Sequence, residues 1–285
     1  MRAMLLGVLA CLVARFPHAQ DPQGGLQQVT TLRGHRDDDI SIFKRRCLLA
    51  AAPCLLPASL SPATADDTIR WSRDGLLSRH ADTLVVLGTN RSLAARGVPS
   101  PREPTRLRDY LGKQLHDCAD RPHAGYLFLS AGNERSHGAL LDDAIEAARR
   151  WSRGSLTDFI GGLEPSEPVI AVSASAGAGI PWHRHHASWL LLLHGSKRWH
   201  LYPPSVHPPG MTSPNPAASD MEATDSSGGH AIWVRSVLPT LGTGQRPLEA
   251  VQHPGEILYV PEGWQVIPAR LQSSHWQATD TCSPT

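Results

Sequence analysis

Residues 177–204 read GAGIPWHRHHASWLLLLHGSKRWHLYPP and hold the strongest functional pattern in the sequence. His183 and His185 lie two residues apart behind a Gly/Pro turn, and an apolar run follows. Successive side chains of a strand alternate between its two faces, so both imidazoles point the same way. Two imidazoles that converge on one small volume supply half of a metal site. His183 and His185 are therefore the first candidate metal ligands.

The apolar run and the segment after it predict a β-hairpin. Residues 189–193 have the composition of a buried strand, residues 194–196 (HGS) have turn chemistry, and residues 197–202 return as a second strand. On the returning strand Lys197 and Trp199 share one face. An inward lysine requires an anion beside it, because the burial of a lone ammonium is costly. We therefore expect Lys197 to face the same cavity as the two imidazoles.

The stretch resembles the jumonji C (JmjC) family of cupin-like, Fe(II)- and 2-oxoglutarate-dependent oxygenases, and most of all those members with His-x-His where most have His-x-Asp or His-x-Glu. A second block, PGEILYVPEGW at residues 254–264, resembles the strand and turn that precede the third metal ligand of the family. Weaker similarity covers residues 71–92 and 107–111. The resemblance implies a mainly β fold, a double-stranded β-helix (jelly roll) buttressed by N-terminal helices.

The resemblance also assigns roles to single residues. It implies that His183 and His185 are the first two ligands of Fe(II), and that Lys197 holds the distal carboxylate of 2-oxoglutarate. An imidazole in place of a carboxylate removes a negative charge from the site, which weakens Fe(II) binding and favours zinc or copper. Leu190 stands where an asparagine often assists, so one polar contact is lost. Tyr202 and Trp182 line the pocket or belong to the core.

The third metal ligand departs from the family pattern. In the family a histidine follows almost directly after the Gly-Trp of the second block, whereas Trp264 precedes Gln-Val-Ile-Pro in this chain. Either the site has lost its third ligand, or residues 265–274 interrupt it and His275, in HWQATDT, is the displaced ligand. Pro268 disfavours a continuous strand here. We accordingly expect an incomplete or aberrant C-terminal strand.

Composition narrows the classes of partner. The formal net charge of +1 disfavours a nucleic acid or an acidic membrane as partner. The family resemblance implies a protein substrate or a protein partner. The 24 glycines and 24 prolines predict many turns and suit an all-β jelly roll better than a helical bundle. We expect no transmembrane segment.

The N-terminal part has its own organisation. Residues 1–20 carry Arg2 and then an apolar stretch with the length of a signal-peptide core, too short to span a bilayer. This predicts entry into the secretory pathway, and the resemblance implies the endoplasmic-reticulum lumen. If the segment is no signal peptide, we expect the cytoplasm or nucleus. Residues 21–66 show no sustained periodicity and are predicted to be a linker or disordered extension. Cys47 and Cys54 form a disulfide in an oxidising compartment or remain buried thiols.

Residues 67–285 are expected to form the JmjC/cupin-like domain, with its core at 155–285. Apolar spacing predicts helices that pack on the core, and short β-branched or aromatic runs predict strands. The expected helices cover residues 71–80, 105–116 and 139–151, and the expected strands cover residues 83–87, 125–129, 169–173 and 256–260.

Three functions are compatible with these patterns. The first is an Fe(II)- and 2-oxoglutarate-dependent protein hydroxylase or demethylase with a degenerate metal site. The second is a catalytically inactive protein of the same fold that acts as an interaction module in the secretory pathway. The third is a generic cupin that binds zinc or a sugar. Two features distinguish these functions: whether a third metal ligand exists, and what occupies the face that carries Lys197.

Overall fold

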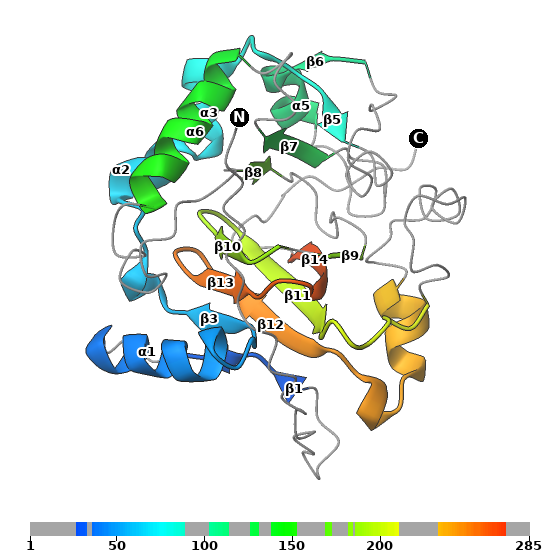
Figure 1. The fold of residues 1–285 in the computed structure, drawn as a ribbon. Helices are drawn as coiled ribbons and strands as arrows, with labels where there is room; N and C mark the ends of the chain where they lie inside the picture. Colours follow the sequence, from blue (N-terminus) through cyan, green and yellow to red (C-terminus); the bar gives the residue numbers. More distant parts are fainter. Residues whose placement is uncertain are drawn as a thin grey trace, which may run out of the picture.

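The computed structural model describes residues 27–32, 36–88, 103–113, 126–130, 138–152, 169–172, 182–184, 186–210 and 233–271. These residues form several β-sheets, with a group of helices at one end (Figure 1). The helices are α1 (Arg36–Phe43), α2 (Ala65–Arg70), α3 (Arg73–His80), α5 (Leu107–Lys113) and α6 (Gly138–Ser152), with short turns η1 (Lys44–Leu48), η2 (Ala58–Leu60), η4 (Trp233–Val237), η5 (Leu238–Thr240) and η6 (Thr243–Gln245).

The larger sheet has the strand order β1-β12-β11-β14-β9 within the described part of the chain. Its centre is β11, which pairs antiparallel with β12 on one side and with β14 on the other. This places the residues of the quoted stretch in the middle of the sheet. The strands are β1 (Gln27–Gln28), β9 (His183–Arg184), β11 (Ser196–Tyr202), β12 (Leu248–Gln252) and β14 (Gln265–Leu271).

The second sheet packs face to face against the first. Its order is β10-β13-β3-β2, with β2 (Thr30–Thr31), β3 (Cys54–Leu56), β10 (Ser188–Leu191) and β13 (Ile257–Val260). One core cluster lies between the two sheets and takes side chains from both, because alternate residues of each strand point inward. Its buried members are Val29, Leu55, Trp199, Leu201, Ala250, Leu258, Val260, Trp264 and Val266.

The predicted hairpin of residues 189–202 is wrong. The two strands form over nearly the expected residues, but β10 pairs with β13 and β11 pairs with β12 and β14, so they belong to different sheets. The chain changes sheet at residues 192–195, where Gly195 has φ +78° and Leu192 exchanges backbone hydrogen bonds with Gly255 and Glu256. The predicted change of direction at residues 194–196 is confirmed by the bend at His194 and Gly195, whereas the strand partners come from distant parts of the chain.

The structure also differs from the expected linker at residues 21–66. Its described residues supply β1, β2, β3 and α1, and β3 pairs with β13 in the smaller sheet. Phe43 and Cys47 are fully buried against the outer side of that sheet. A disulfide joins Cys47 to Cys54, which selects one of the two alternatives left open by the sequence. The segment lacks periodicity because its elements are short and buried by neighbours far away in sequence.

The helical end has a separate core cluster. Figure 1 shows α6 beside α2 and α3, next to the sheet of β5 (Leu87–Gly88), β7 (Tyr126–Ser130) and β8 (Val169–Val172), while β4 (Leu84–Val85) pairs with β6 (Thr105–Arg106). The predicted helices at 71–80 and 139–151 are confirmed as α3 and α6. The helix predicted at 105–116 is confirmed as α5 from Leu107 to Lys113, whereas Thr105–Arg106 forms β6 and residues 114–116 lie outside the described residues. The four predicted strands are confirmed within a few residues as β4 with β5, β7, β8 and β13.

Pro268 lies inside β14, so the expectation that it interrupts the strand is wrong. Pro268 pairs with Trp199 of β11, and β9 pairs with β14 only at Gln265 and Val266. Among the described residues β14 therefore has one neighbour at this position, and a proline is tolerated where a strand faces no second partner. No helix in the described ranges has the length and apolar character needed to cross a membrane.

Candidate functional site

His183 lies on the inner face of the larger sheet. It is half-buried in β9 and pairs in register with Val266 of β14, which in turn pairs with Leu201 of β11. Directly opposed residues of antiparallel strands point to the same side of the sheet. Val266 and Leu201 are fully buried members of the core cluster between the sheets. The His183 side chain is therefore directed toward that interior.

Lys197 lies on the same face, at the other end of β11. It alternates in register with Trp199 and Leu201, and its Nζ lies 5.5 Å from the centroid of the Trp199 ring. Four residues of strand separate Lys197 from Leu201, which corresponds to about 13 Å. The structure thus puts His183 and Lys197 on one face but at different levels of the sheet. Their roles as metal ligand and 2-oxoglutarate anchor stay predictions.

The other two predicted ligands, His185 and His275, lie outside the described residues. Within the residues that the structure does describe, no group of three or more His, Cys, Asp or Glu side chains could hold a metal ion. The metal site expected from the sequence is therefore represented in the described structure by His183 alone.

Val266 occupies the position that decides whether a third ligand can meet His183. It follows Trp264 by two residues, close to where the family resemblance places a histidine, and it is the residue directly opposite His183. Its side chain is 0% exposed and aliphatic, so it offers no electron pair to a metal. The described residues consequently do not complete a three-ligand face for Fe(II), and no oxidative step is derived from them.

The Gln252 side chain forms hydrogen bonds with the buried polar groups around it, opposite Lys197 in the sheet. Its Oε1 accepts a hydrogen bond from Trp199 Nε1 at 3.0 Å, and its Nε2 donates to the carbonyl oxygens of Leu190 at 2.6 Å and Glu256 at 2.8 Å. Gln252 is 1% exposed and pairs in register with Lys197. It joins the larger sheet to the smaller one. Sequence reasoning missed it, and only its place opposite Lys197 could have indicated it.

Leu190 points into the same interior, where its partner in register is Leu258. An apolar side chain there matches the loss of a polar contact inferred from the sequence. The space between the sheets is thus occupied mainly by hydrocarbon, with Lys197 and His183 at its margins.

Tyr202 and Trp182 belong to a cluster on the outer face of the larger sheet, with Trp233, Leu241 and Ile267. They do not line the inner face. The Tyr202 hydroxyl donates to the carbonyl of Gln245 at 2.6 Å, and burial raises the pKa of Tyr202 to about 12. Of the two possibilities given by the sequence, pocket lining or core, the structure places both side chains in the core.

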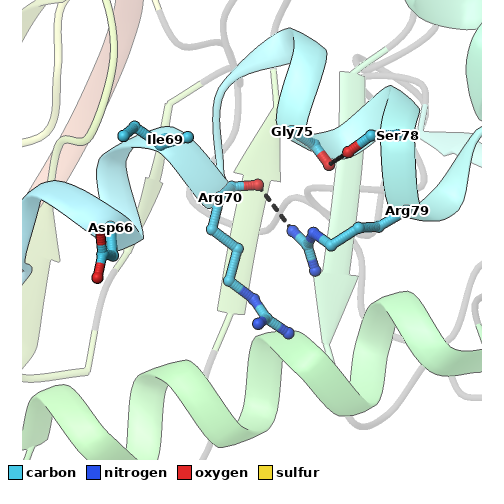
Figure 2. Close-up of a pocket in the computed structure, with 6 residues that line it drawn as sticks. All are labelled: Asp66, Ile69, Arg70, Gly75, Ser78 and Arg79. Atoms are coloured by element: carbon cyan, nitrogen blue, oxygen red, sulfur yellow. Dashed lines mark hydrogen bonds between the residues drawn. The ribbon is translucent and has the colours of Figure 1, made fainter.

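A cavity of about 370 Å³ lies between α2 and α3, far in sequence from the quoted stretch. Figure 2 shows its lining of Asp66, Ile69, Arg70, Gly75, Ser78 and Arg79. The Arg79 guanidinium donates to the carbonyl of Arg70 at 2.7 Å. Both arginines also contact Asp143 of α6. One carboxylate thus contacts both guanidinium groups, and these side chains join α2 and α3 to α6.

Asp143 ties α3 to α6 through His80, whose Nε2 lies 2.9 Å from its carboxylate. Partial burial raises the pKa of Asp143, but hydrogen bonds from His80 and Arg70 and the charges of Arg70 and Arg79 outweigh this effect. The net result is a pKa below the ordinary value of an aspartate. The group is a structural anchor of the helical end.

Relatives of the chain are known over most of its length, although no family model matches it. Over 228 residues the chain is 31% identical to JmjC domain-containing protein 8 of Mus musculus, which covers 79% of this chain and 74% of that protein. The chain belongs to the JmjC domain family.

Other JmjC relatives agree with this assignment. JmjC domain-containing protein 8 of Homo sapiens is 28% identical over 209 residues, which are 73% of this chain and 68% of that protein. The 2-oxoglutarate and iron-dependent oxygenase JMJD4 of Gallus gallus is 32% identical over 170 residues, or 58% of this chain and 38% of that oxygenase. The family therefore includes proteins named for iron and 2-oxoglutarate, and the predicted family membership is confirmed.

Proposed function

We propose that this JmjC protein is a catalytically inactive member of its family that serves as a protein-interaction module. The observation that carries the proposal is Val266, fully buried and in register with His183, at the position where a third ligand would have to lie. In this proposal the two packed sheets are the two halves of a jelly roll, and the fold is retained for the surface that it presents.

The packing between the sheets supports an interaction role. Leu190, Leu201 and Val266 fill the space beside His183 with hydrocarbon. Lys197 Nζ lies 5.5 Å from the centroid of the Trp199 ring, and this cation–π contact stabilises its ammonium. Neither feature requires 2-oxoglutarate.

One observation favours the enzymatic alternative. His183 and Lys197 share the inner face, as a metal ligand and a 2-oxoglutarate anchor would. If His275 supplied the missing ligand, Fe(II) with 2-oxoglutarate would supply oxidative chemistry for hydroxylation or demethylation of a protein side chain. In that case Lys197 would bind and orient the co-substrate, and the apolar residues around it would exclude water.

We also propose that the protein works in the secretory pathway, in the endoplasmic-reticulum lumen. The Cys47–Cys54 disulfide supports an oxidising compartment, because cytosolic thiols are kept reduced. The apolar stretch within residues 1–20 has the length of a signal-peptide core, which also favours entry into the secretory pathway.

The test uses the full chain, purified after secretion, and its His183→Ala variant. Metal content is measured by mass spectrometry, and succinate release from 2-oxoglutarate is measured with added Fe(II). The interaction module is expected to hold no stoichiometric iron and to release no succinate above the level of the variant. Stoichiometric iron together with succinate release that is lost in His183→Ala would refute the proposal.

A Val266→His substitution tests the register on which the proposal depends. Side chains directly opposed on antiparallel strands have Cβ atoms about 5 Å apart, which lets two imidazoles share a metal ion. We expect Val266→His to bind Zn²⁺ more tightly than the parent protein, and the additional His183→Ala substitution to abolish the gain. Equal Zn²⁺ affinity in the folded variant and its parent would show that position 266 does not face His183.

A further inference from the structure

A second cavity of about 360 Å³ lies on the opposite side of the larger sheet from His183. It is lined by Arg184, Pro204, Ser205, Val206, His207 and Gln265. Arg184 and Gln265 are paired in register on neighbouring strands, next to the His183–Val266 pair. Arg184 follows His183, and Gln265 precedes Val266. Because side chains alternate along a strand, Arg184 points away from the inner face. The cavity is thus separate from the candidate metal site, although it adjoins the same strand.

The far wall of the cavity is the loop after β11, and several contacts hold this loop in place. Gln265, which is 3% exposed, donates from Nε2 to the carbonyl of Val206 at 2.6 Å. The Val206 amide donates to the carbonyl of Pro203 at 3.0 Å. Gly263 has φ +82°, and a Cβ there would lie 3.2 Å from the Pro204 ring. The wall is therefore formed before any ligand arrives, which lowers the entropic cost of binding.

The charge of the cavity is cationic. Arg184 is exposed, and among the residues that the structure describes no acid pairs with it. The acid nearest along the chain to the cavity, Glu262, contacts His186 at 3.7 Å instead. On the same sheet, Arg198 of β11 pairs with Glu249 at 3.1 Å, so the two arginines differ in their partners. None of the described residues that line the cavity is acidic, and Ser205 and His207 line it together with Arg184.

We propose that this cavity binds a carboxylate side chain of an acidic segment in a partner protein. A guanidinium offers two parallel N–H donors that match the geometry of a carboxylate. Val206, 37% exposed, and Pro204 give the rim an apolar flank that a peptide can cover and a free small anion cannot. The choice of a protein partner rests on the interaction function proposed above.

The test measures the binding of a fluorescein-labelled peptide of alternating Glu and Ala to the full chain by fluorescence anisotropy. The variants are Arg184→Glu and the conservative Arg184→Lys. The matched control is Arg45→Glu, which makes the same charge change at an exposed position of η1, remote from the cavity. Thermal unfolding establishes that each variant is folded.

Saturable binding is expected, weakened about tenfold or more by Arg184→Glu, partly by Arg184→Lys and less than about twofold by Arg45→Glu. A peptide with Gln in place of Glu is expected not to bind. Equal weakening by Arg45→Glu would mean general charge attraction and would overturn the proposal. So would full displacement of the peptide by the same concentration of inorganic phosphate or glutarate, which would assign the cavity to small anions.

These outcomes are independent of the metal test. Succinate release together with Arg184-dependent peptide binding would refute the inactive-module proposal and leave the cavity assignment intact. Absence of both turnover and peptide binding would leave the module proposal intact and overturn the cavity assignment.

Discussion

Replacement of Gln252 by leucine should destabilise the protein more than the same change at any other described glutamine. Gln252 makes three hydrogen bonds, at 3.0, 2.6 and 2.8 Å, to groups on β10, on β11 and before β13. A buried hydrogen bond contributes about 1 kcal/mol net, so the loss of three lowers the free energy of unfolding by about 3 kcal/mol. Leucine has a similar size, and the effect therefore reports on hydrogen bonding more than on volume.

Two other glutamines provide graded controls. Gln265 is also buried and donates one hydrogen bond, to Val206, so Gln265→Leu should cost about 1 kcal/mol. Gln28 is exposed on β1, and its replacement should change stability by less than about 0.5 kcal/mol. The three values should therefore follow the number of hydrogen bonds lost.

The assay is urea unfolding followed by tryptophan fluorescence, at neutral pH and with the disulfide intact. A double-mutant cycle with Trp199→Phe isolates the indole contact, whose coupling to Gln252 should be about 1 kcal/mol. If Gln252→Leu unfolds at the same urea concentration as the parent while Gln265→Leu does not, the two sheets are not joined through Gln252.

Three further predictions concern other parts of the molecule. Because the pKa of Asp143 is lowered in the folded state, its carboxylate adds stability at neutral pH, and this stability is lost as the pH falls from about 4 through the folded-state pKa. Asp143→Asn should therefore lower the free energy of unfolding by about 2 kcal/mol at neutral pH. Urea titrations at several pH values should show a flatter acid dependence for this variant. Reduction of the Cys47–Cys54 disulfide, which closes a loop with a sequence separation of 7, should cost about 2 kcal/mol, read from thermal unfolding with and without reductant. Tyr202, with a pKa of about 12, should ionise at higher pH than an exposed tyrosine and add stability that is lost as the pH rises above about 10. An ultraviolet titration of phenolate should show one group that ionises late. Absence of that group in the parent protein, or its persistence in Tyr202→Phe, would contradict the prediction.

Local patterns predicted the helical end of the fold well. The spacing of Leu140, Leu141 and Ala144 with acids early and bases late predicts an amphipathic helix, and α6 buries those side chains as expected. The strand at 256–260 was equally clear from its apolar run. Signals of this kind are local, since periodicity and composition within a few residues are enough to produce them.

The partners of each strand could not be read from the sequence. β10 and β11 look like a hairpin because they are close along the chain, yet β10 pairs with β13 and β11 with strands more than forty residues away in sequence. The residues before position 66 look like a linker because their strands are only two or three residues long. Such short strands acquire stability only from distant neighbours, as β3 does from β13. The turn before β3 is held in the same way, since the Trp264 indole donates a hydrogen bond to the carbonyl of Ala51 at 2.9 Å.

The assignment of position 266 to the inner face depends on register, and several contacts fix that register. A slip of one residue would turn Gln265 or Ile267 inward and move Val266 outward. Gln265 is held outward by its hydrogen bond to Val206, and Ile267, 1% exposed, is packed with Trp182 in the outer cluster. Both would have to leave buried contacts for a polar side chain to reach His183 from this strand. A metal ligand on β14 opposite His183 therefore requires a substitution at Val266, because the backbone has no low-energy way to offer another residue.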